Sequence, residues 1–177
     1  MAVKSILLLR HAKSAWKDAH LADHDRPLSP RGARNAAALA RYLPSLGLRV
    51  DLVLCSTALR TRQTLAALMG QWRGPAPPLA LEAGLYLASD TALLARLQAL
   101  PEQVSTVLLV GHNDGIWQLA QGLAGRGDAR LREMLAERYP TGCLSMLQCK
   151  DRPWAELAWG SAELIALVRP RDLAPPQ

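Results

Sequence analysis

Short apolar runs that alternate with helix-like segments are the feature of this sequence that most limits its fold. The apolar runs cover residues 3–9, 51–55 and 106–110, with a shorter one at 79–81. Helical patterns follow at residues 30–46, 58–69, 90–100 and 115–123. Strands separated by helices in this way predict a mostly parallel sheet with helices on both faces. We therefore expect a three-layer α/β/α protein around a mostly parallel central sheet.

Local signals mark the ends of two of these helices. Ser29 is a suitable N-cap, Pro30 stands at the first helical position, and Gly47 follows the end of the helix expected at 30–46. The helix expected at 90–100 has Ser89 or Asp90 as its N-cap. These signals predict that each of the two helices begins directly after a loop.

The last third of the chain has a different pattern. Residues 143–149, 156–159 and 163–168 are predicted to form consecutive strands joined by short turns, which makes the sheet mixed at one edge. The sequence contains neither an internal repeat nor a low-complexity linker. We therefore expect a single domain spanning residues 1–177.

Composition and charge exclude several classes of protein. Half of the 177 residues are hydrophobic and a fifth are charged, which is typical of a globular chain. No apolar run approaches the roughly 20 residues of a membrane span, and we identify no signal peptide. The three cysteines lack CxxC spacing, which argues against a disulfide framework or a zinc site. We expect a cytoplasmic monomer that does not bind membranes.

The basic residues are unevenly divided between the two types. The 21 Lys and Arg residues exceed the 15 Asp and Glu residues by six, and 17 of the 21 are Arg. Guanidinium groups suit phosphate and carboxylate partners, although a bias of codon usage would produce the same excess. The charges are scattered and no nucleic-acid motif is present, so we expect no nucleic-acid partner.

Histidine and arginine residues fall where the predicted strands end. His11 and His112 directly follow the first and third apolar runs, and Arg10 precedes His11. Arg60 lies in the first turn of the helix after the second run. Because the carboxyl ends of parallel strands lie at one edge of the sheet, we expect these four side chains to come together.

Such a group of side chains suits phosphate chemistry. Arginine forks and helix N-termini bind phosphate oxygens, and a neutral imidazole can attack phosphorus to form a phosphohistidine. The arginines are expected to lower the pKa of the imidazole, which keeps it unprotonated near neutral pH. Cationic neighbours and the lack of HExxH or HxH spacing argue against zinc, so we expect neither a metal nor another cofactor.

Several segments, taken in order, resemble a known family. The run LRHAKS at 9–14 resembles the Arg-His-Gly signature of the histidine phosphatase (phosphoglycerate mutase-like) superfamily, with Ala12 in place of the usual Gly. More narrowly, nearly the whole chain resembles the SixA-like phosphohistidine phosphatases. The matching segments are RHAKSAW at 10–16, DRPLS at 25–29, STALRTRQT at 56–64, LY at 85–86, GHN at 111–113, PTG at 140–142 and RPR at 169–171.

The resemblance implies roles for individual residues. His11 would be the nucleophile that accepts the phosphoryl group, Arg10 and Arg60 would bind its oxygens, and His112 would donate a hydrogen bond to it. Arg26 would line the pocket, although a salt bridge to Asp23 or Asp25 that anchors its loop is an equal alternative. Ser14 and Asn113 would be flanking donors to phosphate or substrate.

The general acid is the least defined role. Many superfamily members use a Glu between the second and third motifs to protonate an alkoxide leaving group. Glu82 is the candidate in that interval, with Asp90 and Asp114 as alternatives, although a solvated residue at a strand end is the slightly favoured interpretation of Glu82. Asp114 stands where the family often has Pro.

These expectations lead to one hypothesis with two alternatives. We expect a metal-independent phosphatase that hydrolyses phosphohistidine in a protein through a covalent phosphohistidine on His11. A phosphomonoesterase of the same superfamily, acting on a sugar or nucleotide phosphate, is the alternative. A module that binds anions or nucleic acid without turnover is a third interpretation, disfavoured by the scattered charges.

Overall fold

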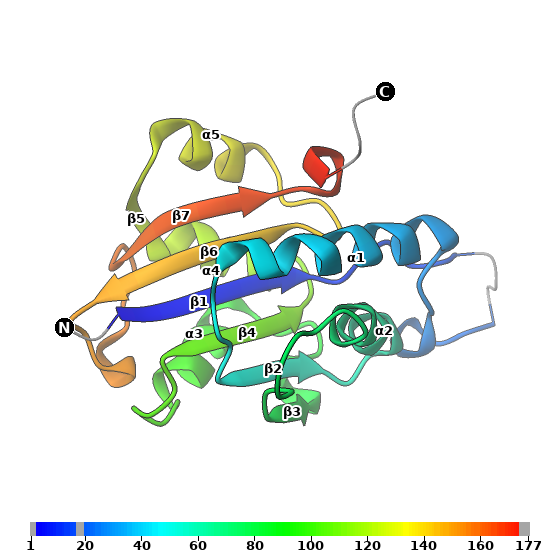
Figure 1. Ribbon diagram of the computed structural model, residues 1–177, viewed down its shortest axis with the longest axis horizontal. Helices are drawn as coiled ribbons and strands as arrows, with labels where there is room; N and C mark the ends of the chain where they lie inside the picture. The colour runs from blue at the N-terminus through cyan, green and yellow to red at the C-terminus, as the bar shows by residue number, and fades with distance from the viewer. Residues whose placement is uncertain (1–2, 17–19, 174–177) are drawn as a thin grey trace.

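A seven-stranded sheet forms the centre of the molecule. The computed structural model describes residues 3–16 and 20–173, and Figure 1 shows their arrangement. Across the sheet the strand order is β3-β2-β4-β1-β6-β7-β5. The strands are β1 (Val3–Arg10), β2 (Leu52–Ser56), β3 (Leu79–Glu82), β4 (Thr106–Gly111), β5 (Ala124–Gly127), β6 (Leu144–Lys150) and β7 (Ala162–Val168).

The sheet is mixed, as the sequence predicts. Strands β3, β2, β4 and β1 pair in parallel, whereas β6 pairs antiparallel with both β1 and β7. Strand β5 then pairs in parallel with β7. Of the described strands, β6 alone runs against the others, so the carboxyl ends of β1, β2 and β4 lie at the same edge.

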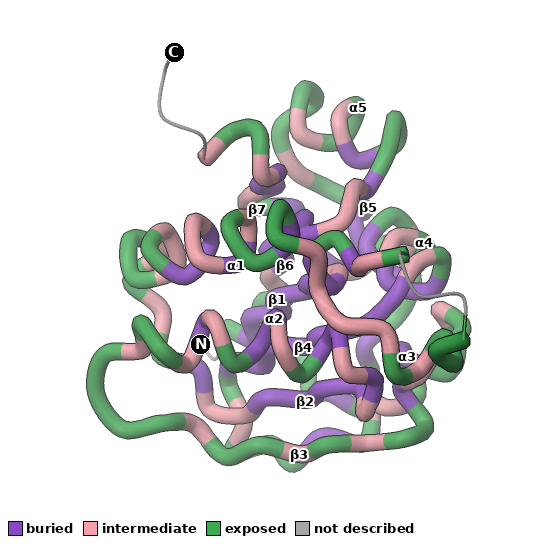
Figure 2. Tube along the Cα trace, turned by 90° about the vertical axis from the view of Figure 1, so that its right-hand side faces the viewer, coloured by how far each residue is buried: buried purple, intermediate pink, exposed green. Residues whose placement is uncertain are grey.

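Helices cover both faces of the sheet, which confirms the three-layer prediction (Figure 1). The helices are α1 (Pro30–Tyr42), α2 (Leu59–Met69), α3 (Asp90–Gln98), α4 (Gly115–Leu123) and α5 (Ala129–Glu137). Alternate residues of β1 pack on opposite faces: Ile6 and Leu8 join the core under α3, α4 and α5, whereas Leu7 and Leu9 join the core under α1 and α2. Figure 2 shows the central strands as the most buried part of the chain.

The helix ends follow the predicted signals. Ser29 Oγ accepts a hydrogen bond from the Gly32 N–H at 3.0 Å, and Ser89 Oγ accepts one from the Ala92 N–H at 3.2 Å. The helix expected at 30–46 is α-helical to Tyr42 and then continues as a 3₁₀ turn over Leu43–Leu46. Pro44 has no N–H to continue the α-helical pattern, which accounts for the change. Gly47 ends this turn with a left-handed φ of 63°.

One prediction about the tail is wrong, and two elements that precede the tail were not predicted. Residues 156–159 do not form a strand, because Trp154–Glu156 make a 3₁₀ turn after Pro153 and the buried Trp154 ring donates to the Val104 carbonyl at 2.7 Å. The structure also contains β5 and α5, which were not predicted. The Ala-Gly-Arg-Gly sequence of β5 has no apolar alternation, so only its pairing with β7 makes it a strand.

Two further sequence-based expectations can be compared with the structure. Cys55, Cys143 and Cys149 are buried and form no disulfide, and burial raises the pKa of Cys55 and Cys143 to about 12. Among the described residues, no helix is long and apolar enough to cross a membrane.

Candidate active site

A polar hollow of about 400 Å³ opens at the carboxyl ends of β1 and β4. It collects six of the residues predicted from the sequence, and Trp16 forms part of its wall. The six are Arg10, His11, Ser14, Arg60, His112 and Asn113. Strand order explains the convergence, because β4 lies between β1 and β2 and the three strands end at one edge.

His11 follows β1 directly and is almost fully buried. Its Nε2 lies 3.3 Å from Arg60 Nε, which can only donate, so Nε2 is the unprotonated nitrogen. Its Nδ1 lies 2.7 Å from the Ala12 carbonyl and therefore carries the proton. The loop is held in turn, because the Ala12 N–H donates to Thr64 Oγ1 on α2 at 3.0 Å. The ring is thus a neutral tautomer at the hollow whose Nε2 lone pair accepts the Arg60 N–H.

Arg60 lies in the first turn of α2 and contacts both histidines. Its Nη2 donates to His112 Nδ1 at 3.3 Å and to Asp23 Oδ2 at 2.9 Å, and its Nη1 donates to the Asp23 carbonyl at 2.5 Å. The residue is 4% exposed, so these contacts are made in a largely desolvated place. Arg60 therefore holds the two rings and the Asp23 loop in one arrangement.

His112 follows β4 and has the opposite tautomer. Its Nδ1 accepts from Arg60, so the proton lies on Nε2, which donates to Ser56 Oγ at 2.8 Å. The ring centroids of His11 and His112 are 5.3 Å apart. In this arrangement both ring nitrogens are engaged by protein groups. A hydrogen bond from His112 to a phosphoryl group would therefore require a proton on Nδ1.

Both imidazoles are held in the neutral form. Burial, more than any other cause, lowers the pKa of His11 to about 4 and that of His112 to about 3. Arg60 and Arg10 lower both pKa values further. From the sequence, the arginines are expected to lower the pKa of His11. In the structure, burial lowers this pKa more than the arginines do.

Asp23 and Tyr86 belong to this cluster, although neither was predicted to act there. The Tyr86 hydroxyl donates to Asp23 Oδ2 at 2.6 Å, and the Tyr86 ring packs edge-on against His112 with centroids 5.3 Å apart. The Tyr86 hydrogen bond, followed by the contact with Arg60, lowers the pKa of the Asp23 carboxyl. From the sequence, Asp23 was weighed only as a partner of Arg26, and Leu85-Tyr86 only as part of a resemblance.

Arg10 is held on the other side of His11. Its Nη1 donates to the Tyr139 carbonyl at 2.8 Å, and Asn113 Nδ2 donates to the same oxygen at 3.1 Å. Arg10 Nε and Asn113 Oδ1 are buried and lack partners within the described structure. One donor and one acceptor beside the hollow thus have no partner among the described residues.

Arg26 lies next to the hollow and is not one of its lining residues. Its guanidinium stacks on the Trp16 ring at 3.6 Å from the centroid. No ion pair joins it to Asp23 or Asp25 in the part of the chain that the structure describes, so the loop-anchoring salt bridge is not found. Its Nε and Nη1 are buried without partners.

The candidate general acids lie elsewhere. The Glu82 carboxylate is bound by Arg96 through contacts of 2.8–3.1 Å and does not line the hollow. The alternative interpretation, a solvated residue at a strand end, fits this placement better than a general acid does. Asp90 and Asp114 also lie outside the lining: Asp90 accepts from the Thr91 N–H at the start of α3, and Asp114 precedes α4.

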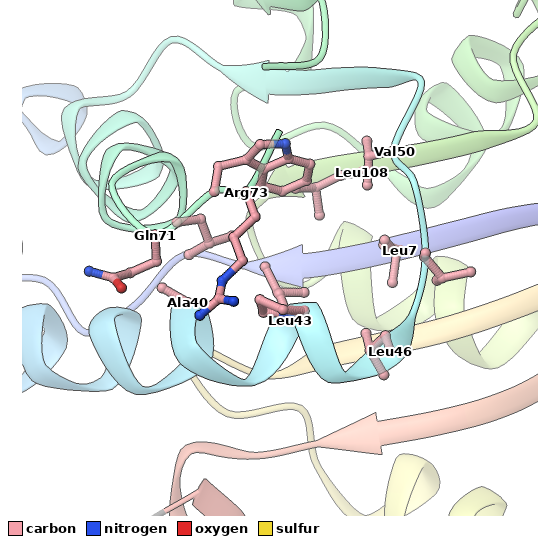
Figure 3. A pocket seen from close by; sticks show the side chains of 12 residues that line it. Leu7, Ala40, Leu43, Leu46, Val50, Gln71, Arg73 and Leu108 are labelled. Carbon is pink, nitrogen blue, oxygen red and sulfur yellow. The ribbon is translucent and has the colours of Figure 1, made fainter. Parts of the chain in front are cut away.

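Two other features of the described chain bear on ligands. The described residues contain no group of three or more His, Cys, Asp or Glu side chains that could hold a metal ion. A small apolar pocket of about 80 Å³ lies between the end of α1 and the sheet, lined by residues such as Leu7, Leu43 and Leu108 (Figure 3). It shares no lining residue with the polar hollow.

Comparisons with known proteins identify relatives of this chain. A model of the histidine phosphatase superfamily (branch 1) matches residues 6–85. The uncharacterized protein Rv1276c of Mycobacterium tuberculosis is 38% identical over 165 residues, which cover 92% of this chain and 100% of that protein.

Two solved structures are similar over nearly their full length. A protein from Nakamurella multipartitia, provisionally named the phosphohistidine phosphatase SixA, is 32% identical with a TM-score of 0.83, covering 96% of this chain and 98% of the other. A protein of the same provisional name from Agrobacterium tumefaciens is 30% identical with a TM-score of 0.79, covering 94% and 97%.

Proposed function

Because this chain belongs to the histidine phosphatase superfamily, we propose that it is a protein phosphohistidine phosphatase that works through a covalent phosphohistidine on His11. The observation that carries the proposal is the state of His11. Its Nε2 is unprotonated, accepts a hydrogen bond from Arg60, and belongs to a residue that lines a hollow with further cations. A neutral imidazole among fixed positive charges is the arrangement that phosphoryl transfer to nitrogen requires.

The proposed reaction has two steps. When the phosphoryl group enters, the Arg60 Nε–H turns from His11 Nε2 to a phosphoryl oxygen, and the freed lone pair of Nε2 attacks the phosphorus. The bond from phosphorus to the substrate's imidazole nitrogen breaks at the same time, and its electron pair leaves with that imidazole. Water then attacks the phosphorus of the phosphohistidine, the P–N bond breaks with its electron pair returning to Nε2, and the proton of the water passes to solvent as phosphate leaves. The hydrogen bond from His11 Nδ1 to the Ala12 carbonyl keeps the same tautomer available for the next turnover.

Fixed positive charge supplies the catalysis in this proposal. Arg10 and Arg60 would neutralise the charge that spreads over the phosphoryl oxygens, so the mechanism calls for no metal. A phosphoryl dianion beside His112 would favour a proton on Nδ1, which then donates to the phosphoryl group. Ser14 and Asn113 line the same hollow and would contact phosphate or substrate, and Arg26 would bind substrate at the entrance.

The acid–base character of the hollow supports phosphohistidine as the substrate. Asp23 is the one carboxylate among the described residues that line it, and its lowered pKa keeps it ionised and unable to donate a proton near neutral pH. An alkoxide leaving group needs such a proton. An imidazole is a better leaving group and can carry its own proton, so its departure needs no carboxylic acid. The full-length similarity to two proteins provisionally named phosphohistidine phosphatases supports the same choice.

Turnover of a generic aryl phosphate tests the mechanism. We expect wild-type protein to hydrolyse it, with or without EDTA, and His11→Ala to be inactive. The control is His24→Ala, which changes a partly exposed imidazole outside the lining of the hollow. Phosphoenzyme trapped from labelled substrate should survive alkali and be destroyed by acid, as a P–N bond is. Acid-stable, alkali-labile label would refute His11 as the nucleophile.

Comparison of substrates tests the leaving-group argument. We expect kcat/KM to be at least 100-fold higher for a phosphohistidine peptide than for sugar or nucleotide monophosphates. Glu82→Gln should leave both rates unchanged, because that carboxylate is bound to Arg96. Faster hydrolysis of a monophosphate, or loss of that activity in Glu82→Gln, would favour a small-molecule phosphomonoesterase instead.

A further inference from the structure

A strongly basic groove adjoins the catalytic hollow. The groove has a volume of about 300 Å³ and shares Lys13 and Thr141 with the hollow as a common wall. Four arginines also line the groove: Arg31, Arg138, Arg169 and Arg171. No carboxylate is found among the described residues that line the groove. A ligand that occupies the hollow can therefore extend directly into a region of predominantly positive charge.

Neighbouring acidic residues neutralise this charge only in part. Asp172 binds Arg169 through contacts of 3.1 and 3.2 Å and reaches Arg171 at 3.9 Å. Glu137 lies 3.7 Å from Arg138, and both side chains are more than half exposed, so that pair is weak. Across the described residues, Lys13 and Arg31 form no ion pair. The groove thus keeps a net positive charge.

The wall of the groove is a fixed extension of the site. The Gly142 N–H donates to the Arg10 and His11 carbonyls at 3.1 and 2.9 Å, which ties residues 138–142 to the nucleophile loop. Arg169 is 7% exposed and is held by Asp172, and its Nη1 has no partner within the described chain. Arg31 lies in the first turn of α1, whose start is bound to the Lys13 carbonyl through Ser29. These segments come from four parts of the sequence and meet beside His11.

We propose that this groove binds a second anionic group, a carboxylate or a phosphate, of the substrate whose phosphoryl group enters the hollow. The inference rests on the proposed function and narrows the substrate to one with negative charge near the phosphorylated residue. Arginine forks bind carboxylate and phosphate alike. The two sources are acidic residues that flank a phosphohistidine in a protein and a second phosphate on a small molecule.

Two pairs of probes separate these sources. The first pair is a phosphohistidine peptide with Glu on both flanks and the same peptide with Gln. The second pair is a hexanediol bisphosphate and hexyl monophosphate. We expect the Glu-flanked peptide to have a KM about tenfold below that of the Gln-flanked peptide, and this advantage to shrink with added salt. An advantage for the bisphosphate alone would support the groove with a small-molecule ligand.

Charge reversal tests whether the groove causes the preference. Arg31→Glu with Arg171→Glu should remove the tenfold advantage and leave aryl phosphate hydrolysis unchanged. The matched control is Arg34→Glu with Arg41→Glu, which changes the net charge equally at exposed positions of α1 outside the groove. Arg31→Ala with Arg171→Ala is the milder second variant, and thermal unfolding checks that each protein is folded.

The outcomes distinguish the two proposals. If wild-type protein hydrolyses aryl phosphate and shows no preference in either pair, the groove proposal is wrong and the proposed function stands. A control variant that loses the preference as strongly as the groove variant would also overturn it, because general surface charge would then be the cause. Absence of any phosphatase activity would instead refute the proposed function.

Discussion

Arg60 has most of its donors engaged before any substrate binds. Its guanidinium makes four hydrogen bonds, to His11, His112 and twice to Asp23. An arginine has five N–H groups, so one remains. A phosphoryl group that binds Arg60 must therefore compete with the Asp23 carboxylate, which is also held by Tyr86. The Asp23 carboxylate therefore occupies a position at Arg60 that a phosphoryl oxygen of the substrate would take.

Replacing Asp23 by Asn tests this competition. Asn keeps the size of the side chain and removes its charge, so we expect inorganic phosphate to inhibit Asp23→Asn about tenfold more tightly than wild type. The measurement is competitive inhibition of aryl phosphate hydrolysis. Asp25→Asn is the control, since Asp25 contacts His24 and does not line the hollow. Weaker inhibition in Asp23→Asn would mean that the carboxylate chiefly positions Arg60.

The buried histidines predict how stability depends on pH. The pKa of His11 falls from 6.5 to about 4 in the folded protein, so between these values the unfolded chain binds more protons. The free energy of unfolding must therefore fall as pH drops through this window. We expect wild type to lose on the order of 2 kcal/mol more than His11→Asn between pH 7 and 4.5, from urea unfolding. Equal losses in the two proteins would contradict a neutral buried His11.

At the scale of elements, two rules made the site predictable. Apolar runs identified β1, β2 and β4, and the rule that ligands bind beyond the carboxyl ends of parallel strands brought His11, Arg60 and His112 together. Asp23 and Tyr86 escaped prediction because they lie on loops, whose path no periodicity indicates. Strand β5 and helix α5 were missed for a related reason, since their identity depends on pairing with β7 and packing on α4.

The contact between α1 and the nucleophile loop is an element-scale feature that can be tested. A Cβ on Gly32 would lie 2.1 Å from the Lys13 carbonyl oxygen, and that oxygen also accepts hydrogen bonds from Ser29. The helix and the loop can approach this closely only without a side chain at this position. We therefore expect Gly32→Ala to displace the loop that carries His11.

The expected cost of Gly32→Ala is about 1–3 kcal/mol in the free energy of unfolding, together with a lower kcat. Chemical denaturation and aryl phosphate kinetics measure the two effects. Gly70→Ala is the matched control, because its Cβ would meet only ordinary contacts of 3.5 Å or more at the end of α2. A Gly32→Ala protein with normal stability and kcat would show that α1 moves freely relative to the loop.

For the whole molecule, the arginine excess was the least interpretable sequence feature. A net charge of +6 indicates anionic partners or codon bias equally well. Arg10 and Arg60 could be assigned to the site because they lie close to the ends of predicted strands. The groove arginines come from segments that meet only in the complete fold. Their position beside the hollow depends on the antiparallel return of β6 and on the segment after β7, neither of which a local pattern determines.

A buried lysine at the opposite end of the sheet allows an effect on stability to be tested separately from an effect on activity. Lys4 is 4% exposed at the start of β1, and its Nζ donates to the Glu102 and Val104 carbonyls at 2.7 and 3.1 Å. It also contacts the Glu102 carboxylate at 3.1 Å and the Trp154 ring at 5.4 Å from the centroid. Lys4→Met would fill the same space and remove this donor from the Glu102 carbonyl, whereas the Val104 carbonyl would keep the hydrogen bond from the Trp154 ring.

We expect Lys4→Met to lower the free energy of unfolding by about 1–3 kcal/mol, because the loss of a buried donor costs that much. Its kcat/KM should not change, since six residues of extended strand place Lys4 about 20 Å from Arg10. Lys150→Met is the control, because Lys150 is exposed and pairs with Val3 at the same end of the sheet. Parallel loss of stability and kcat in Lys4→Met would show that packing at one end of β1 controls the position of His11 at the other.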